Sequence, residues 1–396
     1  MSTRICVDEI LELAQYKTGL TELGSDYSAL IFEGWNCLAK SISDSRTYDA
    51  SGLQARNLQF LRLIEGHLRF EADLKQYPEI RTVPVVAPMF IVDFGRSGST
   101  FLHNLLAQDE NARTPALWEL WEPSPPPRPD TYDTDERIAK TNERLEIVRK
   151  WTPDILKIHS LAAQRPDECL WIKPHGTHFA MQHLAIEYWE WLKGLDEGGL
   201  AALFSYYKLR VQHLQLFCRR GFWLSKSMTH LHYLPVLLDT FPDAKIIRLH
   251  RDPLRVLPST CSLLRSMRFG FQRPNADEAT GEFTLDIFVD GMDRMMALDQ
   301  RCGSGRFVDV DFRDLTDDPI ATVRRIYDQL GRCYTSPLDK KINAYLAEFN
   351  NQPQHRHEYR LEEFALSEGK VMTRSARYLD WLDARLGKHS VAAAQL

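Results

Sequence analysis

The sequence of 396 residues lacks paired cysteines, long apolar runs and an early apolar stretch. Its seven cysteines are scattered without a C-x-x-C pair, which is the wrong spacing for a zinc site or a disulfide framework and fits a reduced chain. No apolar run approaches the roughly 18 residues that a membrane span requires. Because acids stand where a signal peptide would be apolar, we expect no signal peptide, no integral membrane segment and a cytoplasmic protein.

Basic residues are also too few for a nucleic-acid binder. The chain has 49 Lys and Arg against 54 Asp and Glu, whereas a nucleic-acid partner requires a basic face. A local basic pocket for a small anionic ligand remains compatible with this balance. No cluster of metal ligands stands out, so we expect neither a nucleic-acid partner nor a metal.

The sequence does contain helical patterns that alternate with short apolar runs. Residues 1–80 place apolar residues at spacings of three and four, which predicts a helical N-terminal region packed on the core. Strands are predicted at 89–92, 222–226, 245–250 and 307–312, and helical patterns follow them. This alternation predicts an α/β fold with a parallel sheet flanked by helices on both faces.

The remainder of the chain is organised around that sheet. We expect residues 81–396 to form one α/β domain, with a helical insertion at about 131–220 that breaks at HGTHF and DEGG. The segment PSPPPRPD (123–130) predicts an extended surface loop, because proline fixes φ and removes backbone donors.

A glycine-rich turn, DFGRSGST, follows the first predicted strand and precedes a helical pattern. Glycines allow backbone conformations that a Cβ forbids, and the N–H groups at the start of the next helix favour an anion. The residues of this phosphate cradle are Arg96, Ser97, Gly98, Ser99 and Thr100. The nucleoside-triphosphate P-loop requires lysine where Ser99 stands, so the turn is only P-loop-like. The alternative is an ordinary strand–helix turn with a serine cap.

A second strand–turn–helix segment follows the strand 245–250. Asp252 is the expected N-cap and Pro253 the first helical residue. Arg251 then lies at the carboxyl edge of the sheet, and Ser259 follows about two helical turns later. An arginine fork with a serine hydroxyl suits a second phosphate. The alternative is a surface arginine beside a capped helix.

Together these segments resemble the sulfotransferases that use 3′-phosphoadenosine 5′-phosphosulfate (PAPS), closest to a broad, largely bacterial group. The stretches that carry the resemblance are FIVDFGRSGST, WELWEPSPPP, WLSKSMTH, FPDAKIIRLHRDP and HRHEYRLEEF. Met228 departs from the usual proline, and Ser99 from the usual threonine. The resemblance implies that the glycine-rich turn holds the 5′-phosphosulfate and that Arg251 and Ser259 hold the 3′-phosphate. It implies no metal.

Sulfuryl transfer needs a cation at the leaving oxygen and a base for the acceptor hydroxyl. The family pattern K-S-x-x-H is matched by Lys226 and His230, although a solvated lysine and a structural histidine are the alternatives. The second candidate base is Glu119, in a segment whose tryptophans could instead belong to the core. The late basic segment offers Arg356 as a further contact to the 3′-phosphate, unless it is a solvated loop.

The sequence thus predicts transfer of a sulfuryl group from PAPS to a hydroxyl of a small acceptor. Nine tryptophans favour a hydrophobic acceptor, but its identity stays open. The competing hypotheses are a nucleotide-dependent small-molecule kinase and a non-catalytic nucleotide-binding protein. The sequence leaves the oligomeric state open, with a homodimer as one alternative.

Overall fold

The computed structural model describes residues 4–24, 26–45, 47–152, 161–268, 272, 276–299, 304–351 and 359–387. These residues form two compact units. The first unit comprises 1–85, 115–220 and 264–276, and the second comprises 86–114, 221–263 and 277–396, apart from the residues outside the described ranges. The predicted insertion at 131–220 therefore belongs to the same unit as the N-terminal helices.

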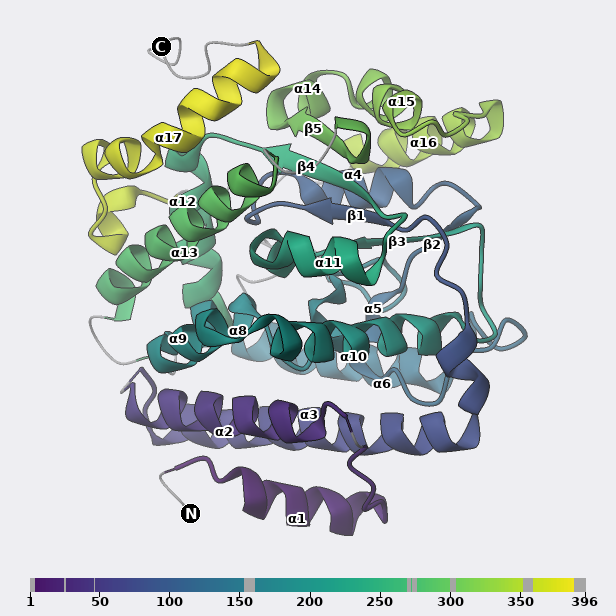
Figure 1. The fold of residues 1–396 in the computed structure, drawn as a ribbon, viewed down its shortest axis with the longest axis vertical. Coiled ribbons are helices and arrows are strands. Elements are labelled where there is room, and N and C mark those ends of the chain that lie inside the picture. The colour runs from purple at the N-terminus through teal and green to yellow at the C-terminus, as the bar shows by residue number, and fades with distance from the viewer. Residues whose placement is uncertain are drawn as a thin grey trace. The chain divides into compact units, whose positions relative to one another are not determined.

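The first unit is helical, as the spacing of apolar residues predicted. Its elements are α1 (Val7–Thr18), α2 (Ser28–Asp44), α3 (Ala50–Gln76), η1 (Pro78–Thr82), α5 (Leu117–Trp121), α6 (Glu136–Trp151), η2 (Cys169–Ile172), α8 (Thr177–His183), α9 (Ile186–Gly194) and α10 (Glu197–Gln215). α1 packs along α3 and α2 along α9 (Figure 1). A buried hydrogen bond of 2.8 Å between His213 Nε2 and Asp73 Oδ2 joins α10 to α3. The apolar faces of these helices thus bury one another.

The second unit is built on a five-stranded sheet in the order β2-β3-β1-β4-β5. The strands are β1 (Met89–Val92), β2 (Ala112–Arg113), β3 (Phe222–Lys226), β4 (Lys245–His250) and β5 (Phe307–Asp311). All strand pairs are parallel, with Ile91 opposite Ile247 in β1 and β4. The four strands predicted from sequence are confirmed, β5 ending one residue early. The two-residue β2 was missed, because it is too short to show a pattern.

Helices cover both faces of this sheet (Figure 1). On one face are α4 (Ser99–Leu106), α14 (Phe312–Asp317), α15 (Pro319–Gln329) and α16 (Ser336–Asn350), whose apolar side chains share a core with the strands. The other face carries η3 (Met228–Tyr233), α11 (Leu234–Thr240) and α17 (Glu368–Leu386). There the ring of Phe90 packs on His230 and Phe241, while His250 Nδ1 lies 2.9 Å from the hydroxyl of Tyr378. The predicted parallel sheet with two helical layers is therefore confirmed.

The remaining elements are α12 (Pro253–Met267), α13 (Ala276–Asp299), η4 (Ser304–Arg306) and η5 (Leu361–Phe364). α12 begins as predicted, since Asp252 Oδ1 accepts a hydrogen bond of 2.9 Å from the backbone N–H of Leu254. Within the described ranges, no helix combines the length and apolar character needed to cross a membrane.

An ionic network is buried beneath α17. Arg248 on β4 is 1% exposed and its Nε donates to Asp309 Oδ1 on β5 at 2.7 Å. Arg385 on α17 donates to Asp309 Oδ2 at 2.7 Å and to Asp299 Oδ2 at 2.6 Å. His250 Nε2 lies 2.8 Å from Asp309 Oδ1. The C-terminal helix is thereby joined to the sheet through hydrogen-bonded charges as well as apolar contacts.

Candidate functional site

The strand order marks one edge of the sheet as the expected ligand site. β1 lies in the middle; the chain passes from it to the outer strand β2, returns to β3 beside β1, and then reaches β4 on the other side. Open α/β sheets bind ligands at the carboxyl ends of strands beside such a reversal. The glycine-rich turn after β1 and the Arg251 turn after β4 both lie at that edge.

The glycine-rich turn departs from ordinary backbone geometry. Gly95, Arg96 and Gly98 all have left-handed φ values, of 95°, 57° and 88°. Glycine adopts this region freely, whereas Arg96 must be held there by its neighbours. α4 begins directly afterwards at Ser99, and its N-terminus has no side-chain cap. Helix N–H groups without such a cap attract anions, so the turn fits a phosphate or sulfate group.

The hydroxyl of Ser97 is turned toward the protein interior. It donates a hydrogen bond to Oδ2 of Asp93, and both side chains are 2% exposed. A serine hydroxyl has one proton to donate, so in this conformation Ser97 offers an anion only its backbone N–H. Sequence reasoning missed Asp93, because nothing in the pattern distinguishes a carboxylate that braces the turn from one in an ordinary loop.

The two predicted anion sites meet through Arg96. Its Nε donates to the hydroxyl of Ser259 on α12 at 3.0 Å, and its carbonyl oxygen accepts from Nη1 of Arg251 at 2.6 Å. Arg251 is half-buried and forms no ion pair within the part of the chain that the structure describes. A guanidinium without a carboxylate partner at a strand end is available to an anionic ligand.

Lys226 joins the same edge of the sheet. It is the last residue of β3, lies opposite Ile91 in β1, and is 3% exposed. Its Nζ donates to the hydroxyl of Thr100 at 3.1 Å, in the first turn of α4. The structure thus brings together the lysine and the glycine-rich turn that the sequence separated by more than a hundred residues.

His230 and His232 follow Lys226 on η3, and both are buried. The ring of His230 meets the ring of Phe90 edge-on, with 5.1 Å between their centres. Nε2 of His232 lies 3.0 Å from the carbonyl oxygen of Ile287, and burial lowers the pKa of His232 to about 4. His232 is therefore a neutral structural histidine. His230 lies on the same element, two residues nearer to Lys226.

Glu119 lies in the first unit, on α5, and is fully buried. Its Oε2 accepts hydrogen bonds from the backbone N–H of Ala116 at 2.8 Å and from the hydroxyl of Tyr132 at 2.5 Å. The neighbouring Trp118 is fully buried in a small apolar cluster. These contacts describe a capped helix end with its tryptophan in the core.

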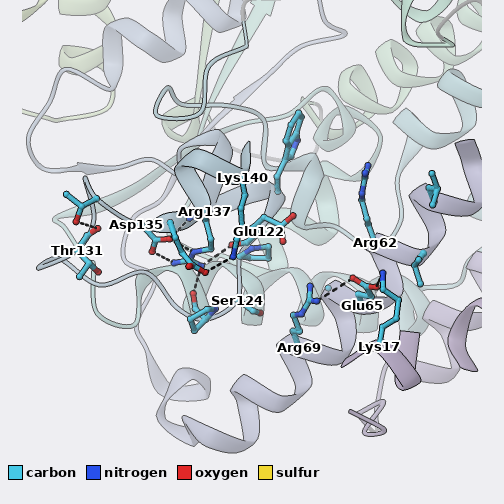
Figure 2. A pocket seen from close by; sticks show the side chains of 18 residues that line it. Lys17, Arg62, Glu65, Arg69, Glu122, Ser124, Thr131, Asp135, Arg137 and Lys140 are labelled. Atoms are coloured by element: carbon cyan, nitrogen blue, oxygen red, sulfur yellow. Dashed lines mark hydrogen bonds and ion pairs between the residues drawn. The ribbon is translucent and has the colours of Figure 1, made fainter. Parts of the chain in front are cut away.

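The first unit also contains a pocket of about 810 Å³, shown in Figure 2. α1, α3, α5, α6 and the loop between α5 and α6 contribute its lining, and Trp121 and Glu122 belong to it. Half of the lining residues are charged, and most of these charges pair with one another. The pairs are Lys17–Glu65, Arg69–Glu65, Arg137–Asp135 and Lys140–Glu136. So polar a lining does not suit an apolar ligand, and we assign the pocket no part in the reaction.

Two further sequence predictions concern Arg356 and metal ions. Arg356 lies outside the described residues. Among the residues that are described, no group of three or more His, Cys, Asp or Glu side chains is arranged to hold a metal. The donors gathered at the sheet edge are instead arginine, lysine and hydroxyl groups, a set suited to anions.

Comparison with known proteins identifies the fold. The structure of sulfotransferase STF1 from Mycobacterium tuberculosis matches with a TM-score of 0.85 and 23% identity, covering 95% of this chain and all of that one. Sulfotransferase STF9 from Mycobacterium avium matches with a TM-score of 0.83 and 25% identity, covering 97% and 98%. The arrangement of elements is thus that of these enzymes.

Sequence comparison agrees with the structures. The chain is 28% identical over 298 residues to the omega-hydroxy-beta-dihydromenaquinone-9 sulfotransferase Stf3 of Mycobacterium bovis, covering 72% of this chain and 73% of that protein. The Mycobacterium tuberculosis protein of the same name matches to the same extent. The model of the sulfotransferase family matches residues 88–336, which is more than half of the chain and contains both anion turns. The chain therefore belongs to the sulfotransferase family.

Proposed function

We propose that this sulfotransferase takes its sulfuryl group from PAPS and delivers it to a hydroxyl of a small, apolar acceptor. The donor carries anionic groups at both the 3′ and the 5′ side of one adenosine, so its site needs two anion pockets within one nucleotide. The hydrogen bond of 2.6 Å between Arg251 Nη1 and the Arg96 carbonyl is the observation that carries the proposal. It joins the two predicted pockets directly.

The 3′ side of the proposed site consists of Arg251 and Ser259. An arginine fork and a hydroxyl together recognise a phosphate through charge-assisted hydrogen bonds. Arg96 contributes to both sides: its backbone belongs to the glycine-rich turn, and its guanidinium lies 3.0 Å from Ser259 Oγ. From sequence alone, we add Arg356 as a further contact to the 3′-phosphate.

The 5′ side consists of the glycine-rich turn and the start of α4. Gly98 and the backbone of Ser97 let the chain approach the phosphosulfate closely, and Ser99 and Thr100 add hydroxyl donors near it. Lys226, hydrogen-bonded to Thr100, stabilises the negative charge that develops on the departing diphosphate. Positioning and charge stabilisation are what this class of transfer requires of a protein.

We assign the general base to His230. A neutral imidazole can take the proton of the acceptor hydroxyl while the oxygen attacks sulfur. His230 is four residues after Lys226 in the same unit. Glu119 is the weaker candidate, because its Oε2 already accepts two hydrogen bonds at the start of α5. The products are a sulfate ester, adenosine 3′,5′-diphosphate and a proton.

The acceptor class rests on the relatives. The Stf3 enzymes act, as their name states, on omega-hydroxy-beta-dihydromenaquinone-9, a hydroxylated acceptor. The aromatic content of this chain, with nine tryptophans, is compatible with an apolar alcohol or phenol. We therefore propose an apolar molecule with one reactive hydroxyl. A screen of such acceptors with labelled PAPS tests donor and acceptor together.

Ligand-dependent stability tests the donor without an acceptor. Adenosine 3′,5′-diphosphate should raise the melting temperature in the absence of magnesium, because a ligand that binds only the folded state stabilises it. Arg251→Ala should weaken PAPS binding about 10- to 100-fold, the worth of a charge-assisted bond, and barely affect adenosine 5′-phosphosulfate. Stabilisation by ATP with magnesium but not by the diphosphate would overturn the proposal in favour of a kinase.

A further inference from the structure

Phe312 stands where the chain leaves the sheet next to the predicted donor site. It is the first residue of α14, directly after β5, and it is half-buried. The helix starts abruptly because Asp311 Oδ1 accepts a hydrogen bond of 2.8 Å from the backbone N–H of Arg313. β5 runs parallel to β4, so this turn brings Phe312 to the same carboxyl edge as Arg251.

The ring of Phe312 packs against the backbone of the glycine-rich turn. A Cβ placed on Gly98 would lie 3.0 Å from Cδ2 and 3.2 Å from Cε2 of Phe312. These distances are shorter than ordinary carbon contacts, so the ring occupies the side of Gly98 where a side chain would point. The aromatic ring and the missing side chain therefore fit each other, and the ring lies against the 5′ pocket.

The same ring contacts Arg251. The guanidinium carbon of Arg251 lies 4.1 Å from the centre of the Phe312 ring, within range of a cation–π contact. In addition, Nη1 of Arg251 donates a hydrogen bond of 2.6 Å to the carbonyl oxygen of Arg96. Since Arg251 has no ion pair within the described ranges, these two contacts fix the direction of its guanidinium.

We propose that Phe312 is a positioning residue that holds Arg251 against the glycine-rich turn and so determines the selectivity for a 3′-phosphorylated nucleotide. The inference rests on the proposed function, in which Arg251 binds the 3′-phosphate. A planar guanidinium supported by a ring is already ordered before the ligand arrives, so less side-chain entropy is lost on binding. Without the ring, Arg251 would have to be ordered by the ligand itself.

The test compares two leucine substitutions, one at the first residue of β5 and one at the residue that directly follows β5. Phe312→Leu keeps apolar bulk beside Gly98 but removes the aromatic face. Phe307→Leu is the matched control, because Phe307 begins β5 and its ring centre lies 4.6 Å from the guanidinium of Arg248, away from the carboxyl edge. Calorimetry would measure Kd for adenosine 3′,5′-diphosphate and for AMP, and their ratio is the selectivity for the 3′-phosphate.

Phe312→Leu should lower this selectivity about three- to tenfold, the range of a cation–π contact, with little change in AMP affinity. Phe312→Tyr should restore it, and Phe307→Leu should leave it unchanged. In the Arg251→Ala background, Phe312→Leu should have no further effect on selectivity, since the two changes remove the same interaction. If Phe312→Leu folds poorly, Phe312→Met offers the same measurement with a longer apolar side chain.

The outcomes separate the inference from the proposed function. If the wild type prefers the diphosphate and Phe312→Leu keeps that preference, the inference is wrong and the proposed function stands. Equal losses of affinity for both nucleotides, with a lower melting temperature, would show a merely structural role and would also overturn it. A wild type that does not prefer the diphosphate over AMP would refute the proposed function itself.

Discussion

Both compact units bury titratable side chains, but two buried histidines of the helical unit are neutral whereas a buried aspartate of the sheet unit keeps its charge. In the helical unit, burial lowers the pKa of His175 and of His178 to about 3, so both rings are neutral at physiological pH. In the sheet unit, burial favours a higher pKa for Asp309, but hydrogen bonds from His250 and Arg248 outweigh it and lower the pKa. Burial alone thus does not decide the charge; an oppositely charged neighbour does.

A similar contrast exists between two arginines of the sheet unit. Arg248 and Arg251 are three residues apart at the end of β4, yet Arg248 is tied to two aspartates while Arg251 has no ion pair among the described residues. A charge that is neutralised inside the fold holds the fold together. A charge left without an ion pair at a ligand-binding edge can bind an anion. The predictions below probe this division.

The largest effect is expected where a buried charge network is broken. Asp309→Asn should destabilise the protein by about 3–5 kcal/mol, because it removes the nearer of the two carboxylates that pair with the buried guanidinium of Arg248 and leaves only Asp299. Asp293→Asn is the control: its ion pair with Arg377 is exposed and should be worth less than about 1 kcal/mol. Chemical denaturation measures both, and equal losses would contradict the comparison.

The Asp309 carboxylate also predicts how the stability of the protein changes at acidic pH. Since the folded pKa of Asp309 lies below its ordinary value, its contribution is fully present above about pH 4, the unfolded value. The contribution is lost as the pH falls from there toward the folded pKa. Asp309→Asn should therefore flatten the stability profile below pH 4, and an unchanged slope would mean that Asp309 does not titrate as described.

Two buried lysines, one in each unit, test the same distinction through enzyme activity. Lys226→Met should lower kcat about 10²- to 10³-fold, the usual cost of losing a donor at a developing charge. Lys173→Met, in the helical unit, should retain most of the activity. Burial lowers the pKa of Lys173 to about 8, so its charge opposes folding at neutral pH. Steady-state kinetics distinguish the two, and similar losses would refute the assignment of Lys226.

Lys173 also predicts a pH-dependent stability. Because the unfolded lysine binds its proton up to about pH 10.4, stability should rise as the pH increases from about 8 toward that value. Lys173→Met should remove this rise and should gain roughly 1–3 kcal/mol at neutral pH. A destabilised variant would show that the ring contacts with Phe204 and Tyr207, at 5.4 and 5.0 Å, outweigh the desolvation of the charge.

The smallest effect is expected from His178. Both of its ring nitrogens are buried without a hydrogen-bond partner in the described chain, whereas His175 bonds to Tyr188 and Ile31. His178→Phe should therefore gain about 1 kcal/mol, while His175→Phe should lose stability. The unfolded imidazole binds a proton below about pH 6.5, so wild-type stability should fall from there toward pH 3. His178→Phe should make that decline shallower; an identical decline would contradict the buried, neutral ring.

The sequence was most informative where structure is encoded by neighbouring residues. The apolar runs at 89–92 and 245–250 identified β1 and β4, and the Asp252-Pro253 pair identified the start of α12. By contrast, the grouping of 115–220 with the N-terminal helices depends on contacts between distant segments, which no local pattern records. The fold class, by contrast, followed from the alternation of strands and helices along the chain.

The same limit applies to the site. The types and spacing of residues drew attention to Arg96, Lys226 and Arg251, which the structure places at one edge of the sheet. Asp93 and Phe312 escaped notice because their importance lies in what they contact, namely a hydroxyl turned inward and a guanidinium from another strand. A carboxylate and a phenylalanine are too common to stand out without their partners.

The position of α17 bears on how small a working enzyme can be made. The match to the family ends at residue 336, whereas Tyr378 and Arg385, which contact His250 and Asp309, lie about forty to fifty residues beyond it. A gene shortened to the matched region would encode a sheet that lacks the hydrogen bond between Tyr378 and His250 and the ion pair between Arg385 and Asp309. Any truncation intended for expression or engineering should therefore keep the chain through Leu386, the last residue of α17.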